Sequence, residues 1–312
     1  MMLIIDGNNM AYRALYTHNL SNHGVDVSVT YGLFNILRAL IKRFKPTSVI
    51  VCWDGGIPAY RREYCPTYKT GRSKDSSRDW EDVYRQMDEC DSMLPVHGVL
   101  SVRLHGAEAD DLMYQASLMA YSAVIVSTDN DMLLAVRDRV GVYNPHRDVM
   151  YNISNFEELV GVKPTNYLAY KALVGDSSDD VPGVKGIGPK TAIKLFEQYG
   201  NVHAIINAAL AGTLALPRTK ARAIAEFGYK GLLNNCVIMG LWQDRLGVRR
   251  KLLTSCDNWE RASKAGIQQY YLANAFVSLL GELGIYTRLQ QPTFRAEGLR
   301  VPAVLIAERT PV

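Results

Sequence analysis

The chain has 312 residues, 48% hydrophobic and 21% charged, with a formal net charge of +4. This is the composition of an ordinary globular protein of about two domains, and no apolar run approaches the roughly 20 residues of a membrane span. The five cysteines form no C-x-x-C pair and the six histidines show no ligand spacing. We therefore expect a cytoplasmic protein without disulfides or a zinc site, in which oxygen atoms hold any metal.

Four short apolar runs read as buried strands, and acidic residues follow each of them. The runs are Met1–Ile5, Ser48–Trp53, Val99–Leu104 and Ala123–Ser127. Helical periodicity separates them, most clearly over Val29–Phe44. Strands that alternate with helices predict an α/β fold with a mostly parallel central sheet flanked by helices. Ligands of such sheets bind at the carboxyl ends of the strands, which is where these acids lie.

One acidic residue after a strand is usually a turn former or a helix cap, and a helix start explains one or two of the three acids at 108–111 well but all three poorly. Many carboxylates at one rim, however, need a counter-charge. Oxygen ligands favour Mg²⁺ or Mn²⁺, and two such ions about 4 Å apart can support phosphoryl transfer to water. The acids concerned are Asp6, Asp54, Glu108, Asp110, Asp111, Asp129 and Asp131.

A long basic insertion, from Ile57 to about Pro95, separates the second and third strands. It reads either as a solvated loop or as a nucleic-acid contact, in which cations neutralise phosphates and aromatic rings stack on bases. Its second part, Asp79–Met93, has the pattern of an amphipathic helix. The residues that favour a nucleic-acid contact are Arg61, Arg62, Tyr68, Lys69, Arg72 and Lys74.

The second half of the chain begins with a predicted strand pair and short helices. The strands are Val140–Tyr143 and Val149–Tyr151, and Ser154 is the expected N-cap of a helix over Asn155–Val160. A helix over Tyr167–Val174 then leads to a second acid cluster, which contains Asp176, Asp179 and Asp180.

A glycine-rich hairpin follows, ahead of a helix over Thr191–Tyr199. It reads either as an ordinary connection between helices or as a site where backbone amides bind a DNA phosphate. The spacing of a nucleotide-binding P-loop is absent. The residues concerned are Gly183, Lys185, Gly186, Gly188, Lys190 and Lys194.

The C-terminal part is predicted to be helical. We expect helices over 214–227 and 231–239, and one long helix over Ile267–Leu283 that packs back on the sheet. Residues 291–312 read as a tail, either flexible or a docking segment for a partner.

The motifs, taken in order, resemble those of the 5′-nuclease family, which includes flap endonucleases, phage 5′→3′ exonucleases and the 5′-nuclease domain of DNA polymerase I. The resemblance covers about residues 1–240. It rests on Asp6-Gly-Asn-Asn, Asp54 before Tyr68-Lys69-x-x-Arg72, Gly106-x-Glu-Ala-Asp-Asp, Ser127-Thr-Asp-x-Asp131 and Gly175-Asp-x-x-Asp-x-x-x-Gly-Val-x-Gly-Ile-Gly-x-Lys190.

The resemblance implies a PIN-like nuclease domain over residues 1–153 with a helical arch at about 57–95. It implies a helical DNA-binding domain over 154–290 that contains a helix–three-turn–helix element at about 175–200. One metal ion would be held mainly by Asp6, Asp54, Glu108 and Asp110. The second would lie near Asp129, Asp131, Asp176 and Asp179, with Asp111 adjacent. Asp180 directly follows Asp179, so whether Asp179 or Asp180 serves the metals stays open.

The same resemblance implies roles for the basic residues. Lys69 and Arg72 match the catalytic pair at the base of the arch, and Tyr68 is the expected platform for a terminal base. The hairpin at 183–190 matches the element that grips duplex DNA, where K⁺ is often bound.

The expected function is therefore that of a Mg²⁺-dependent 5′→3′ exonuclease and flap endonuclease of DNA replication or repair, from a bacterium or a phage. Its partners would be DNA with 5′ ends, flaps or junctions, and RNA-containing primers are a further candidate. Two alternatives remain: a non-catalytic nucleic-acid-binding protein of the same fold, and a metal-dependent ribonuclease.

Overall fold

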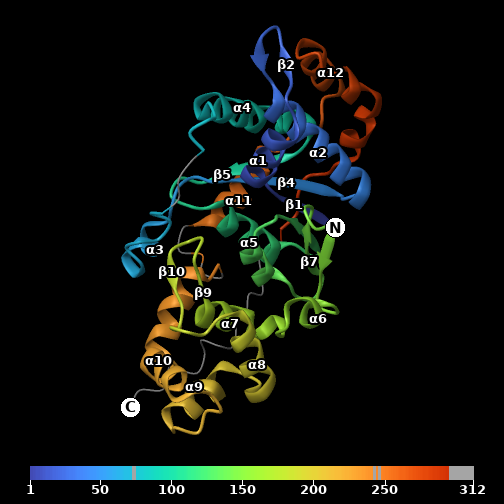
Figure 1. Ribbon diagram of the computed structural model, residues 1–312. Coiled ribbons are helices and arrows are strands. Elements are labelled where there is room, and N and C mark those ends of the chain that lie inside the picture. The colour runs from blue at the N-terminus through green and yellow to red at the C-terminus, as the bar shows by residue number, and fades with distance from the viewer. Residues whose placement is uncertain (72–74, 242–243, 245–246, 295–312) are drawn as a thin grey trace.

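The computed structural model describes residues 1–71, 75–241, 244 and 247–294 (Figure 1). The predictions for Arg72, Lys74 and residues 295–312 lie outside this part of the chain. No described helix is both long and apolar enough to cross a membrane.

Six strands of the described chain form one sheet in the order β5-β4-β1-β6-β7-β8. Neighbouring strands are parallel except for β7 and β8, which form the expected strand pair and are antiparallel. This confirms the mostly parallel sheet. The strands are β1 (Met2–Asp6), β4 (Ser48–Trp53), β5 (Leu100–Arg103), β6 (Ala123–Val126), β7 (Val140–Asn144) and β8 (Val149–Tyr151).

Helices cover both faces of this sheet because its central strands are apolar on both sides. In β1, Leu3 and Ile5 pack on one face, whereas Met2 and Ile4 pack on the other. The first face is covered by α1 (Gly7–Thr17), α2 (Ser28–Phe44), α4 (Trp80–Met93), α12 (Lys264–Ala273) and the 3₁₀ helix η4 (Val277–Arg288).

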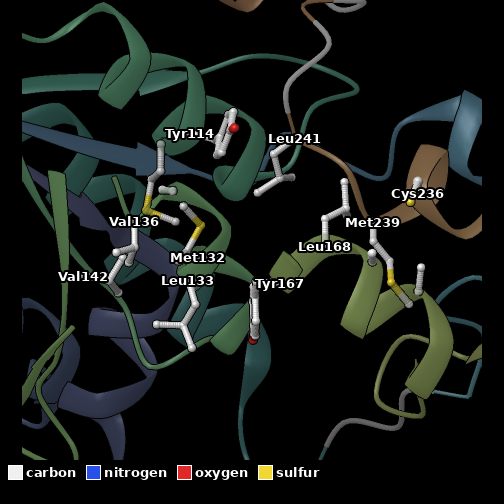
Figure 2. Close-up of a cluster of buried hydrophobic side chains, with 14 of the residues drawn as sticks. Tyr114, Met132, Leu133, Val136, Val142, Tyr167, Leu168, Cys236, Met239 and Leu241 are labelled. Carbon is white, nitrogen blue, oxygen red and sulfur yellow. The ribbon is translucent and has the colours of Figure 1, made fainter. Parts of the chain in front are cut away.

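The second face packs on α5 (Ala109–Met119) and continues into the helical part of the molecule. Figure 2 shows this continuous core, in which Met132 and Val142 of the sheet domain lie in one cluster with Leu168 and Met239. Its remaining helices are η2 (Asn130–Ala135), α6 (Phe156–Val160), η3 (Pro164–Asn166), α7 (Tyr167–Val174), α8 (Pro189–Tyr199), α9 (Val202–Leu210), α10 (Arg218–Met239) and α11 (Val248–Asp257).

The remaining described elements lie in connections between those above. The long insertion between β4 and β5 carries a short helix, α3, ahead of α4 and ends in the 3₁₀ helix η1. Two small hairpins are formed by β2 with β3 and by β9 with β10. Their bounds are α3 (Ala59–Tyr64), η1 (Pro95–His97), β2 (Ser21–Asn22), β3 (Val25–Asp26), β9 (Gly175–Asp176) and β10 (Val181–Pro182).

Several predicted helices have different ends in the structure. The helix expected from Asn155 begins at Phe156, and Asn155, not Ser154, is its N-cap residue. The helix expected over 214–227 begins only at Arg218, after Pro217, and runs on to Met239 through a break at Gly228, where φ is 52°. The two helices expected over 214–227 and 231–239 are thus in the right place, but their boundaries differ.

The long helix expected over Ile267–Leu283 is in fact two short helices. Ala275 adopts a left-handed φ of 58° between α12 and η4, and the Phe276 amide donates to the Tyr271 carbonyl at 2.7 Å. Both helices pack on the sheet domain, as predicted (Figure 1). Residues 154–290 are therefore not one packed unit.

Aromatic side chains make the contact of α12 and η4 with the sheet domain. His97 stacks on Phe34 with a centroid distance of 4.4 Å, and its Nε2 accepts a hydrogen bond of 2.9 Å from Tyr271. Its Nδ1 donates to the Met93 carbonyl at 2.8 Å. Burial lowers the pKa of His97 to about 4, so the ring is neutral at pH 7.

Candidate functional site

The carboxyl edge of the sheet carries the first acids. Asp6 ends β1 and caps α1, where its carboxylate accepts from the Asn9 amide at 2.9 Å and from the Ser127 hydroxyl at 3.0 Å. The next strand, β4, is followed by Asp54, whose carboxylate accepts from the Ala109 amide at 2.8 Å. These hydrogen bonds join the end of β1 to the end of β6, and the end of β4 to the start of α5. The parallel sheet thus brings distant acids to one rim, as expected.

A buried arginine holds the acids at the start of α5. Arg61 of α3 is 2% exposed, and its guanidinium donates to Asp111 at 2.7 and 2.9 Å and to Glu108. A fourth hydrogen bond of 3.0 Å reaches the Ile238 carbonyl in α10. Burial would raise the pKa of Glu108, but Arg61 and Lys69 outweigh it and hold this pKa below its usual value. Arg61 was predicted to contact DNA, but in this structure its side chain is buried and bound to these acids.

Lys69 and Tyr68 extend this ion-pair group. The Lys69 ammonium binds Glu108 and lies 3.5 Å from Asp179. The Tyr68 hydroxyl donates to Glu108 at 3.0 Å and to Asp179 at 3.1 Å. Tyr68, predicted to stack on a terminal base, is only 4% exposed in this structure. Lys69 does lie among the predicted metal ligands.

A second lysine, which is buried, binds the acids that follow β6 and α7. Lys171, on α7, binds Asp131 and donates to Asp176 at 2.7 Å. Burial would raise the pKa of Asp176, but Lys171 and two hydrogen bonds from Ser178 hold it below its usual value. The sequence analysis missed Lys171. A signal existed, since it is the only charged residue in the apolar helix Tyr167–Val174.

Three further acids lack such a cation. In the described part of the chain, no ion pair joins Asp6, Asp110 or Asp129 to a basic side chain. Burial and the charge of Asp54 raise the pKa of Asp6 to about 7, although the Asn9 amide opposes the shift. Burial, with the charges of Asp129 and Asp6, raises the pKa of Asp110 well above its ordinary value. Burial, only partly opposed by Lys171, also raises the pKa of Asp129.

The atoms that this site offers are of the kind that binds a divalent cation. The donors are carboxylates, and three of them carry more negative charge in one place than the chain neutralises. In their present arrangement, no three acidic, histidine or cysteine side chains of the described residues form a ligand set for a metal ion. The ammonium groups of Lys69 and Lys171 form ion pairs with several of the carboxylates. A small pocket nevertheless brings the acids together; it is lined by Arg61, Tyr68, Asp110, Asp131, Asp176 and Asp179.

The glycine hairpin lies between β10 and α8, in the helical part of the molecule (Figure 1). Val184 and Ile187 are buried and anchor it, while the amide of Val184 donates to the Leu173 carbonyl at 2.8 Å. Gly183 is required by close packing, because a Cβ atom there would lie 2.2 Å from the Val174 carbonyl oxygen. The start of α8 has no side-chain cap, and the lysines around it are exposed: Lys185, Lys190 and Lys194.

The remaining predicted site residues are placed as follows. The nine predicted metal ligands lie around the rim, although Asp111 faces Arg61 and also bonds the Glu108 amide at 3.2 Å. Arg62 is exposed and remains a candidate DNA contact. Arg72 and Lys74 are outside the described residues.

Comparison with known proteins gives two family matches in succession. Residues 1–161 match the 5′-3′ exonuclease N-terminal resolvase-like domain, and residues 162–226 match the 5′-3′ exonuclease C-terminal SAM fold. Curated relatives include the 5′-3′ exonuclease of Bacillus subtilis, 32% identical over 66% of this chain and 72% of that protein. The 5′-3′ exonuclease of Aquifex aeolicus is 31% identical over 73% of this chain and 80% of its own length.

Another relative is much longer. The thermostable DNA polymerase I of Thermus thermophilus is 31% identical over 66% of this chain, and the match spans only 25% of the polymerase. Among solved structures, the phage T5 D15 protein co-crystallised with metal ions has a TM-score of 0.65 and 20% identity. That likeness covers 91% of this chain and 99% of the D15 chain, and it supports the fold. The chain belongs to the 5′-3′ exonuclease family of nucleases.

Proposed function

We propose that the chain is a Mg²⁺-dependent, structure-specific 5′ nuclease that hydrolyses DNA phosphodiesters at 5′ ends, flaps or junctions. The observation that carries the proposal is the convergence of carboxylates from the ends of β1, β4 and β6, from α5 and from the turn after α7, beside Lys69. An ordinary structural role for so many acids at one rim would not leave three of them crowded together.

In this proposal the acids hold two divalent cations. Asp6, Asp54, Glu108 and Asp110 would hold one, and Asp129, Asp131, Asp176 and Asp179 the other. When bound, the ions would lower the pKa of the attacking water and neutralise the charge that develops on the phosphate. Asp111 would act indirectly, since it holds Arg61 against Glu108. Mn²⁺ has the same preference for oxygen ligands and would substitute for Mg²⁺.

The basic residues would bind and orient the DNA. Lys69 is 10% exposed and would turn its ammonium group from Glu108 to the scissile phosphate, where it stabilises negative charge. The exposed hairpin lysines and the free start of α8 would bind backbone phosphates of the duplex, which requires no particular base sequence. The hairpin carbonyls are also candidate ligands for K⁺.

The substrate is proposed from chemistry and from relatives. Solved structures with this fold include a T5 D15 flap endonuclease in a pseudo-enzyme-product complex with DNA and metal ions. Their sequence identity to this chain is 20%, so the substrate preference of this chain needs its own test. A role in DNA replication or repair follows if flaps are cut.

The deciding experiment is cleavage of a labelled duplex that carries a 5′ flap, with and without Mg²⁺. We expect cutting near the junction that requires Mg²⁺ and stops with a chelator. Matched substrates with a blunt end, a 3′ flap or an RNA flap separate structure-specific DNA cleavage from ribonuclease activity. Binding without cleavage in Mg²⁺ or Mn²⁺ would instead favour the non-catalytic alternative. Cleavage of the RNA flap alone would favour the ribonuclease.

A further inference from the structure

Two turns from distant parts of the chain meet beside Lys69. The first, residues 65–71, follows α3, and the second is Asp179–Asp180, just before β10. The Lys69 amide donates to the Asp179 carbonyl at 3.1 Å, and the Gly71 amide donates to the Asp180 carboxylate at 2.9 Å. The Thr67 hydroxyl donates to the Asp180 carbonyl at 3.4 Å. The two turns are thus joined through both backbone and side chain.

Both turns contain a residue with a left-handed backbone. The φ angle is 55° at Lys69 and 58° at Asp180, and neither is glycine. Such a conformation costs a non-glycine residue on the order of 1 kcal/mol, and lysine gains nothing from it locally. It persists only when surrounding contacts hold it. The turn around Lys69 is held by its own hydrogen bonds, from the Tyr68 amide to the Cys65 carbonyl at 2.9 Å and from the Thr70 amide to the Thr67 carbonyl at 3.0 Å. The contacts that it makes with another part of the chain are those with Asp179 and Asp180.

The backbone of Lys69 decides where its ammonium group lies. With φ reversed, the side chain would leave the turn in another direction and would no longer reach Glu108 and Asp179. Asp179 is itself proposed as a metal ligand, whereas the carboxylate of Asp180 is used on the Gly71 amide. The two neighbouring acids therefore serve different purposes.

We propose that Asp180 is a positioning residue that holds Lys69 in the geometry needed for cleavage. This inference rests on the proposed function, because it assumes that Lys69 acts on the scissile phosphate. It assigns Asp180 no contact with metal or DNA. It also links the acid cluster that precedes the glycine hairpin to the turn that carries Lys69.

The first test compares Asp180→Ala with Asp180→Asn. Alanine removes the acceptor for the Gly71 amide, and misplacing Lys69 should slow single-turnover cleavage of the flapped duplex by about tenfold at saturating DNA. Asparagine keeps an acceptor oxygen and tolerates left-handed φ, so it should restore the rate to within about twofold of the parent. Affinity for the flapped duplex in Ca²⁺ should be unchanged in both. A slow Asn variant would overturn the proposal, since it would mean that the charge is needed.

The second test asks whether Asp180 acts through Lys69. In a Lys69→Ala background, Asp180→Ala should slow cleavage no further, because the side chain that it positions is gone. Equal losses in both backgrounds would overturn the proposal. If the parent protein does not cleave at all, the proposed function fails instead, so the two failures are distinguishable. Asp138→Ala is the matched control, because Asp138 is exposed and precedes β7 at the opposite edge of the sheet.

A third variant approaches the contact from the other side and serves if Asp180→Ala does not fold. A Cβ atom at Gly71 would lie 3.1 Å from one Asp180 carboxylate oxygen and 3.2 Å from the other, closer than ordinary contact. Gly71→Ala should therefore slow cleavage by about two- to threefold, and this loss should disappear in a Lys69→Ala background, where the side chain to be positioned is absent. A loss of the same size in the Lys69→Ala background would contradict the inference.

Discussion

The acids at the rim form two sets that differ in how the chain balances their charge. The ion-paired set faces Arg61, Lys69 or Lys171, and consists of Glu108, Asp111, Asp131, Asp176 and Asp179. The crowded set consists of Asp6, Asp110 and Asp129, whose pKa values are raised by burial and by the charges of neighbouring acids. The chain therefore balances the charge of the ion-paired set by itself. The crowded set has an excess of negative charge that a bound cation would relieve.

The largest effect is expected in the crowded set. Asp129→Asn should reduce flap cleavage by at least about 10³-fold, because it removes a proposed metal ligand and the charge that attracts the ion. Binding of the flapped duplex in Ca²⁺ should persist. Cleavage at the parent rate would show that Asp129 does not serve the metal.

In the ion-paired set, the largest effect should be on stability. Arg61→Met leaves Glu108 and Asp111 buried without their guanidinium and should lower the free energy of unfolding by about 3–5 kcal/mol. Urea denaturation measures the change. Arg62→Met is the matched control, because the Arg62 side chain next to it in the sequence is exposed. Its substitution should change the free energy of unfolding by no more than about 0.5 kcal/mol. Equal stability of the two variants would mean that the buried ion pairs contribute nothing.

Lys69 belongs to the same set but should affect chemistry more than stability. Lys69→Ala should slow single-turnover cleavage by about 10²-fold, since it removes a cation from the developing phosphate charge. Duplex affinity in Ca²⁺ should change far less. If only affinity falls, Lys69 attracts DNA but takes no part in the chemical step.

The crowded set should also bind protons in the absence of metal. Because the pKa of Asp6 is raised to about 7, this carboxyl group is mostly protonated at pH 6 and ionised at pH 8.5. Metal binding requires the ionised form, so it should release about one more proton at pH 6 than at pH 8.5. Titration calorimetry with Mn²⁺ in buffers of different ionisation enthalpy measures this difference. The same release at both pH values would argue against a raised pKa.

The smallest effect concerns Lys171, whose ammonium group competes with a cation for Asp131 and Asp176. In Lys171→Met the stabilisation by Mn²⁺ should exceed that of the parent by about 1–2 kcal/mol, measured from thermal unfolding with and without the ion. Lys163→Met, at an exposed position of the helical lobe, should match the parent. An unchanged response in Lys171→Met would mean that the lysine and the ion do not compete.

Sequence patterns predicted the sheet and the position of its acids for a clear physical reason. An apolar run followed directly by an acid and a glycine places the acid at the carboxyl end of a strand, and parallel pairing brings such ends together. Asp6 and Asp54 follow this rule, whereas the acids at the start of α5 come after a short turn that separates them from β5. The fold class was therefore accessible from local patterns alone.

The ion pairs were not accessible in this way. Arg61 lies 47 and 50 residues from its acidic partners, and Lys171 lies 40 residues from Asp131. In a basic segment, nothing local distinguishes the one arginine that turns inward from its exposed neighbour Arg62. The break between α12 and η4 was missed for a similar reason, because periodicity of apolar residues continues across Ala275 while the backbone turns.

The aromatic contact around His97 bears on how the chain could be shortened. The regions that match the family end at residue 226, yet Tyr271 and Tyr286 come after that point and close over His97 and Phe34. Truncating the chain at residue 226 would uncover part of one face of the sheet and expose an apolar surface to solvent. Such a fragment should aggregate at concentrations at which the full chain does not, even though every acid of the rim is still present.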